Sequence, residues 1–97
     1  MKIVTVSARF TPENSLVAVN ILGTIQEEAR SMDNCLCYDF YLDPIEKGML
    51  FINQNWGSPE AFEAYRSSDL FNRMIRELKP LMIAAPETNI YEAERAA

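Results

Sequence analysis

The residues best suited to bind a small molecule stand at the end of one short apolar segment. Segment 49–56 reads MLFINQNW, so Gln54 lies two positions before Trp56, the only tryptophan of the chain. In an extended strand these two side chains share a face and lie about 7 Å apart along the strand. A neutral amide beside an indole can orient a flat, oxygenated ligand without burial of a charge. The same residues could equally be a core tryptophan and an amide bonded to the backbone.

Tyr65 is a second candidate, on the helix expected after this strand. A phenol can donate a hydrogen bond to a carbonyl or enolate oxygen of a ligand. It can do so here only if its face of the helix turns toward the sheet. The alternative is an ordinary half-buried helix residue.

The residue types that most often do acid–base, redox or metal chemistry are absent or isolated. The chain has no histidine, the commonest acid–base group and metal ligand. Cys35 and Cys37 would point the same way in a strand, and so close a pair seldom forms a good disulfide. No neighbouring basic residue lowers their pKa, so we expect them to pack as small apolar residues. No carboxylate set has metal-ligand spacing. We therefore predict no metal and no cofactor, and assign no catalytic residue.

Length and charge exclude several classes of function. A chain of 97 residues is expected to form a single domain, 1–97, with one core. Its net charge of −5, from nine Lys and Arg against fourteen Asp and Glu, argues against binding to nucleic acid or to an anionic membrane. No apolar run has the length of a membrane span, and the start does not resemble a signal peptide. With cysteines expected to be reduced, these features favour a cytoplasmic protein.

The hydrophobic pattern and the helix-start signals predict an alternation of strands and helices. The expected elements are a strand over 2–10, a helix over 12–32, strands over 35–42 and 49–56, a helix that begins at 59 and breaks near 67–69, and a strand over 88–92. The order β-α-β-β-α-β is typical of the ferredoxin-like arrangement, an α+β fold. It has a four-stranded antiparallel sheet with both helices on one face.

The other face of this sheet is too apolar to stay in water. The segment 49–52, MLFI, is apolar on both faces, and in the preceding strand the face of Leu36 and Tyr38 is opposed by Cys37 and Tyr41. An antiparallel sheet with one face in water should carry polar residues there. We therefore expect a second copy of the chain to cover this face, which makes a homodimer.

Several short motifs in a fixed order resemble the antibiotic biosynthesis monooxygenase (ABM) domain family. Each is weak alone, but together they extend over essentially the whole chain. In chain order they are NCLCY at 34–38, Asp43-Pro44, QNW at 54–56, SSDLF at 67–71 and LKPL at 78–81. The resemblance implies a dimeric α/β barrel in which the ligand pocket lies between sheet and helices. It places Trp56, Gln54 and Tyr65 around that pocket and adds Ser7, near which family members carry a polar pocket residue.

The chain also departs from the family pattern. Gln54 stands where many members have Glu, Tyr65 where many have His, and Ile52 where polyketide-oxidising members have Asn. Haem-degrading members need an axial histidine, so that branch is excluded. Arg76 corresponds to a family arginine, but by helical position it should face solvent.

The resemblance implies a cofactor-independent monooxygenase that acts on a small aromatic or quinone-type metabolite. Two alternatives stay open. One is a non-catalytic dimer that binds a small apolar or aromatic molecule, and the other is an isomerase or processing enzyme of the same fold.

Overall fold

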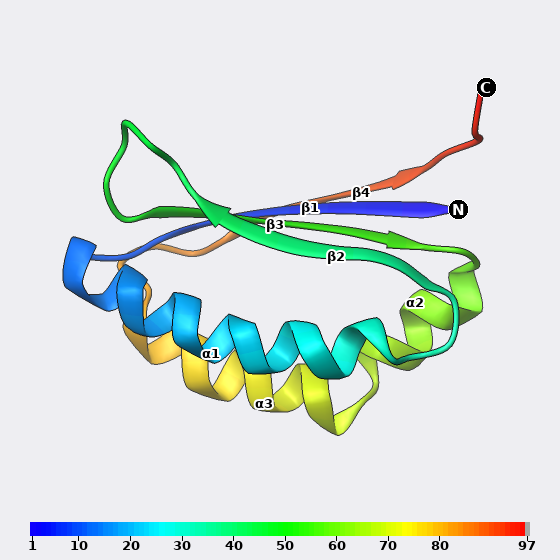
Figure 1. The fold of residues 1–97 in the computed structure, drawn as a ribbon, viewed down its shortest axis with the longest axis horizontal. Helices are drawn as coiled ribbons and strands as arrows, with labels where there is room; N and C mark the ends of the chain where they lie inside the picture. The colour runs from blue at the N-terminus through cyan, green and yellow to red at the C-terminus, as the bar shows by residue number, and fades with distance from the viewer. Residues whose placement is uncertain (97) are drawn as a thin grey trace.

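The computed structural model describes residues 1–96, whose elements alternate as the pattern predicts. Figure 1 shows a single sheet with all its helices on one side. The elements are β1 (Lys2–Arg9), α1 (Pro12–Arg30), β2 (Cys35–Leu42), β3 (Met49–Trp56), α2 (Pro59–Arg66), α3 (Asp69–Leu78), the short 3₁₀ helix η1 (Lys79–Leu81) and β4 (Glu87–Glu92).

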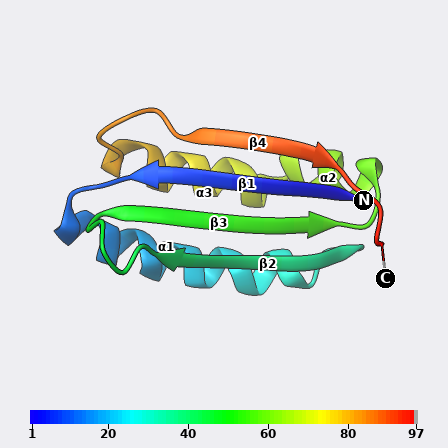
Figure 2. The same ribbon diagram turned by 90° about the horizontal axis from the view of Figure 1, so that it is seen from above.

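The sheet has the strand order β2-β3-β1-β4, and each neighbouring pair is antiparallel. α1 lies below β2, while α2 and α3 lie on the β1 and β4 side (Figure 2). This confirms the ferredoxin-like α+β fold, including the break in the second helix. That break divides α2 from α3, so two separate helices cover the sheet below β1 and β4.

Each of the three α-helices begins at a hydroxyl residue that caps it. The side-chain oxygen of Thr11 accepts from the Asn14 amide, that of Ser58 from the Ala61 amide, and that of Ser68 from the Phe71 amide. Such caps stabilise a helix by about 1 kcal/mol each. The two serine caps fix the start of α2 and the restart of α3, and so set the position of Tyr65 between them.

The core fills the space between α1 and the inner face of the sheet, which is the face toward the helices. α1 buries the apolar stripe expected from its sequence, and β1 and β3 bury alternate residues against it. The residues with almost no exposed surface include Phe10, Leu22, Ile25, Tyr38, Leu50, Trp56 and Tyr65.

A β-bulge at the start of β2 corrects two expectations. Cys35 pairs with Trp56, while Cys37 pairs with Asn55, the residue that precedes Trp56 on β3. Residues paired across an antiparallel ladder share a face, so the two cysteines face opposite sides of the sheet, not the same side. Leu36 is the extra residue of the bulge and is 59% exposed; it does not share the buried face of Tyr38.

The outer face of the sheet, opposite the helices, is not covered by any element in residues 1–96. Tyr41 and Phe51 lie side by side on it, with ring centroids 5.4 Å apart. The Asn53 amide donates to the Tyr41 hydroxyl at 3.3 Å. The outer face therefore combines an exposed tyrosine and a partly buried phenylalanine with an amide that can form hydrogen bonds.

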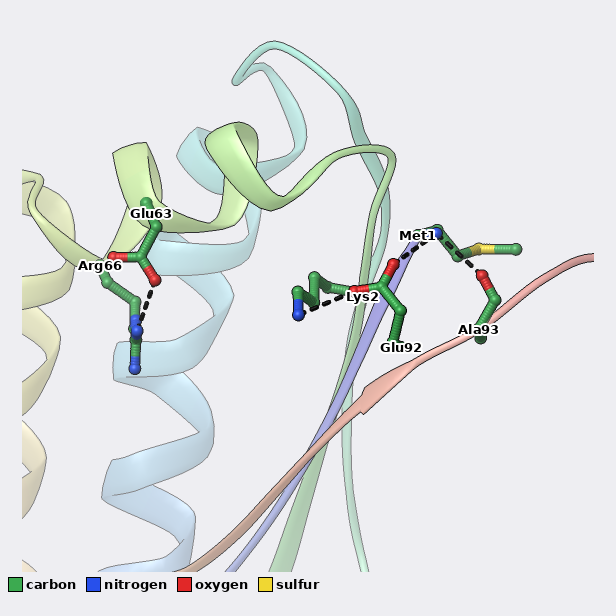
Figure 3. Close-up of polar contacts among 6 residues, drawn as sticks. All are labelled: Met1, Lys2, Glu63, Arg66, Glu92 and Ala93. Carbon is green, nitrogen blue, oxygen red and sulfur yellow. Dashed lines mark hydrogen bonds and ion pairs between the residues drawn. The ribbon is translucent and has the colours of Figure 1, made fainter.

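The first and last strands are joined at one end of the sheet. The Met1 amino group donates to the Ala93 carbonyl at 2.9 Å, and Lys2 forms an ion pair with Glu92 at 2.8 Å (Figure 3). These contacts secure β4, whose residues are all exposed. Within residues 1–96, no helix combines the length and the apolar character that a bilayer crossing requires.

Candidate functional site

A cavity of about 390 Å³ lies between the inner face of the sheet and the helices α2 and α3. Its walls are mostly apolar, with Val6 of β1, Ile52 of β3 and Phe71 and Leu78 of α3 among them. A cavity of this size falls within the range of small-molecule sites. Four residues bring polar side-chain groups to its lining, namely Gln54, Tyr65, Arg66 and Thr88.

Gln54 is the buried polar residue of the cavity. It lies on β3 with 3% of its surface exposed, and its Oε1 accepts from Trp56 Nε1 at 2.9 Å. The pair arises because β3 alternates, so residues two positions apart share the inner face. A buried amide that uses only its oxygen in this way still has its nitrogen available to a ligand.

Trp56 lies behind the cavity and is not part of its lining. Its side chain is fully buried, and its ring stacks on that of Tyr65 with centroids 4.9 Å apart and planes at 27°. The tryptophan therefore supports the two polar residues that line the cavity.

Tyr65 turns inward from α2, as its candidate role requires, and meets a second buried tyrosine. Its hydroxyl lies 2.8 Å from the hydroxyl of Tyr38 on β2. The sulfur of Met74 on α3 lies 3.4 Å from the Tyr38 hydroxyl and 3.6 Å from that of Tyr65. The two hydroxyls thus form a hydrogen-bonded pair, and among residues 1–96 their one further hydrogen-bond acceptor is the Met74 thioether, which is a weak one.

Burial keeps both phenols neutral. It raises the pKa of Tyr38 to about 12, although the hydrogen bond with Tyr65 counteracts part of that rise. Burial also raises the pKa of Tyr65, and the nearby Tyr38 raises it further. Neither tyrosine can serve as a base near neutral pH, so both act as hydrogen-bonding groups.

Arg66 is the one charged residue that lines the cavity. Its guanidinium pairs with Glu63 at 2.5 Å and lies over the Phe62 ring, 4.7 Å from the centroid. Figure 3 shows this pair on α2. The arginine is exposed, so it brings positive charge to the cavity without burial of an ion.

The sequence candidates do not all meet. Trp56 contacts both Gln54 and Tyr65, and these two line the cavity. Ser7 pairs with Phe51 and Glu87 across the sheet. Since Phe51 faces outward, Ser7 lies on the outer face, away from this cavity.

Three residues at the site escaped the sequence analysis. Tyr38, Met74 and Arg66 were not candidates. Tyr38 of β2 and Met74 of α3 come close to Tyr65 of α2 because these elements pack together. The hydrophobic periodicity of a sequence does not reveal such contacts between elements. Arg66 follows Tyr65 directly in the sequence. This charge beside a candidate residue was the one signal that could have marked Arg66 as part of the site. Arg76, by contrast, is exposed as expected.

Apart from the Tyr65 phenol and the Arg66 guanidinium, the lining has no titratable side chain. No carboxylate, lysine or cysteine side chain lines the cavity. Among residues 1–96, no three His, Cys, Asp or Glu side chains gather as a metal site would require. Burial raises the pKa of Cys37 to about 11, with a further rise from its hydrogen bond to Asp39. The arrangement can therefore enclose a ring, donate hydrogen bonds and exclude water.

Solved structures share this fold over almost the whole chain. Two are each described as a "putative antibiotic biosynthesis monooxygenase". The protein from Deinococcus radiodurans is 23% identical, with 100% of this chain and 96% of the other covered and a TM-score of 0.92. The protein from Caulobacter crescentus CB15 is 17% identical, with 97% and 90% covered and a TM-score of 0.90.

A third similar structure is a conserved protein of Bacteroides thetaiotaomicron VPI-5482, described as a possible oxidoreductase. It is 15% identical, with 95% of this chain and 96% of the other covered and a TM-score of 0.88. At these identities the likeness concerns the fold.

Family membership is shown by the sequence itself. No curated protein matches the chain. The family model for antibiotic biosynthesis monooxygenase, however, matches residues 1–77, which extend from β1 to α3. The protein thus belongs to the antibiotic biosynthesis monooxygenase family.

Proposed function

We propose that the protein is a cofactor-independent monooxygenase for a small aromatic or quinone-type metabolite, which binds between the sheet and α2–α3. The observation that carries this proposal is the cavity, with apolar walls and a polar end formed by Gln54 and Tyr65. Membership in the family supports this reaction class.

The reaction needs no external reductant, because the substrate supplies all the electrons. The substrate first loses a proton from a ring hydroxyl or an activated carbon. The resulting anion transfers electrons to O₂, one oxygen atom forms a new carbonyl in place of a CH₂ or a ring C–H, and the other leaves as water. The protein orients the ring, excludes bulk water and donates hydrogen bonds to the oxyanion.

Because no strong base lines the cavity, the substrate must ionise on its own. We expect turnover to rise with pH through the pKa of the substrate and not through that of a protein group. A series of hydroquinones of graded acidity tests this relation, because the pH midpoint of activity should follow each substrate.

The direct test is O₂ consumption by the purified protein with hydroquinones and anthrone-type substrates. We expect uptake above autoxidation, with one O₂ used for each substrate and no loss of activity with a chelator. Heat-denatured protein gives the background rate. Uptake equal to this background for every substrate would contradict the oxidase chemistry.

A non-catalytic binding protein is the second candidate, and the lack of a base in the cavity favours it. The same absence weighs against an isomerase, which must move a proton. Saturable binding of an aromatic ligand without any O₂ uptake would support the binding protein.

We also propose a homodimer formed through the outer faces of two sheets. In the aromatic pair on that face, Tyr41 is exposed and Phe51 is partly buried. Burial of apolar surface against a second copy would stabilise the pairing by about 25 cal/mol per Å².

A further inference from the structure

The orientation of the Gln54 amide is determined by its partner. The indole N–H of Trp56 can only donate, so the group that it meets at 2.9 Å must be the amide oxygen. The amide nitrogen then has to point away from the indole. The assignment of oxygen and nitrogen, which is often ambiguous for glutamine, thus follows from chemistry.

The Gln54 amide nitrogen has no hydrogen-bond partner among residues 1–96. Every fully enclosed side-chain nitrogen or oxygen in that range has one. The nitrogen of this almost fully buried residue must therefore reach open space, and the cavity is the open space that Gln54 lines. Its two N–H groups are donors that await an acceptor.

Tyr65 is arranged in a similar way by Tyr38. The two hydroxyls have one proton each, but three short contacts link them to each other and to Met74. One contact joins the hydroxyls, and the other two run from each hydroxyl to the Met74 sulfur. When Tyr38 donates to Tyr65, the Tyr65 proton has only the sulfur as acceptor. Met74 and Tyr65 both line the cavity, and an oxygen of a ligand is a stronger acceptor than a thioether.

The remaining polar groups do not oppose this arrangement. Arg66 adds donors and a positive charge, and Thr88 can donate or accept. Glu63 is paired with Arg66 and does not line the cavity. Apart from the threonine hydroxyl, the polar lining presents protons.

We propose that Trp56 is a positioning residue that holds Gln54 as a donor, so that the cavity selects the oxyanion form of a phenol or enol over its neutral form. This deepens the proposed function, since it specifies the form in which the substrate binds. A neutral hydroxyl can accept a hydrogen bond from Gln54, but its own proton would find no strong acceptor in the lining other than the Thr88 hydroxyl. An oxyanion has no proton to place and so suits a lining of donors.

The test is binding of para-nitrophenol without oxygen, followed by absorption. This probe is not a substrate for oxidation, and its phenol and phenolate forms have different spectra. We expect the protein to bind phenolate about tenfold more tightly than phenol, which lowers the pKa of the bound probe by about one unit. Equal binding of both forms, or no binding at millimolar probe, would overturn the proposal.

Two variants separate positioning from packing. Trp56→Phe removes the indole N–H and frees the amide to rotate, so the preference for phenolate should fall severalfold while the neutral form still binds. Gln54→Glu keeps an oxygen for the indole but replaces the donor by a carboxylate, so the preference should reverse. If Trp56→Phe does not fold, Gln54→Glu still tests the donor role of the amide, on which positioning by Trp56 depends.

Asn72→Asp is the matched control. It makes the same amide-to-acid change at an exposed position of α3 that does not line the cavity, and it should keep the preference of the wild type. Retention of that preference in folded Gln54→Glu would show that Gln54 is purely structural. Because the probe is not oxidised, the result is independent of the O₂ uptake that tests the proposed function.

Discussion

At the scale of single residues, the tyrosine pair couples the site to stability. Tyr38 and Tyr65 are neutral when folded because burial disfavours their phenolates. In the unfolded chain both phenols titrate near their ordinary value of 10. Between that value and the raised values of the folded protein, the folded state binds more protons than the unfolded state.

The two buried tyrosines should therefore make the free energy of unfolding fall as pH rises above the ordinary tyrosine pKa. Each of the two tyrosines contributes a slope of about 1.4 kcal/mol per pH unit in that window. Urea unfolding at a series of alkaline pH values measures the slope, and Tyr38→Phe should remove the contribution of one tyrosine from it. Tyr91→Phe removes an exposed phenol and should leave it unchanged. An equal slope in wild type and Tyr38→Phe would contradict the coupling.

The sequence predicted part of this site, for reasons that are local. Gln54 and Trp56 were grouped because alternation along one strand places them on the same face. Tyr65 was added because it could reach the same site if its face of the helix turned toward the sheet. Ser7 was added through resemblance alone, and the strand register places it on the outer face. Tyr38 could be assigned only once the positions of β2 and α2 were known.

At the scale of elements, the two glycines Gly23 and Gly48 have opposite roles. In α1, a Cβ atom at Gly23 would meet nothing within 4 Å. Gly48, just before β3, has φ of 85° and a Cβ there would lie 2.1 Å from the Phe10 carbonyl oxygen. The Phe10 amide also donates to the Gly48 carbonyl at 2.8 Å, so this close contact joins the hairpin to the end of β1.

We expect Gly23→Ala to stabilise the protein by about 1 kcal/mol, because alanine is the better helix former. Gly48→Ala should destabilise it by well over about 1 kcal/mol, because both the positive φ and the contact with Phe10 oppose a side chain. Denaturant midpoints of the two variants give the comparison. A Gly48→Ala protein as stable as wild type would contradict the described turn.

Helix starts and strand spans were predictable because their signals are short and strong. The hydroxyl caps, the prolines that follow Thr11 and Ser58, and the alternation of β3 all act within a few residues. The bulge at Cys35–Cys37 was not predictable, because no glycine or proline marks it. It depends on how β2 must shift to pair with Trp56.

At the scale of the whole molecule, the outer face determines assembly. Phe51→Asp should shift the proposed dimer to monomer, because a charge buried between two sheets is strongly disfavoured. Light scattering at micromolar concentration measures the mass. Leu16→Asp makes the same apolar-to-acid change on exposed α1 and should leave the dimer intact. A wild-type monomer at that concentration would contradict the dimer.

The pairing of β4 with β1 has a consequence for biosynthesis. In the sheet, β1 lies between β3 and β4, and Lys2 pairs with Glu92. The second neighbour of β1 is therefore synthesised about 90 residues after β1 itself. Until then β1 has a bare edge, and such edges recruit strands from other chains. A nascent chain that has not yet released residues 87–92 should therefore be the form most prone to aggregate and most in need of a chaperone. Fast translation of this last strand would shorten that period of risk.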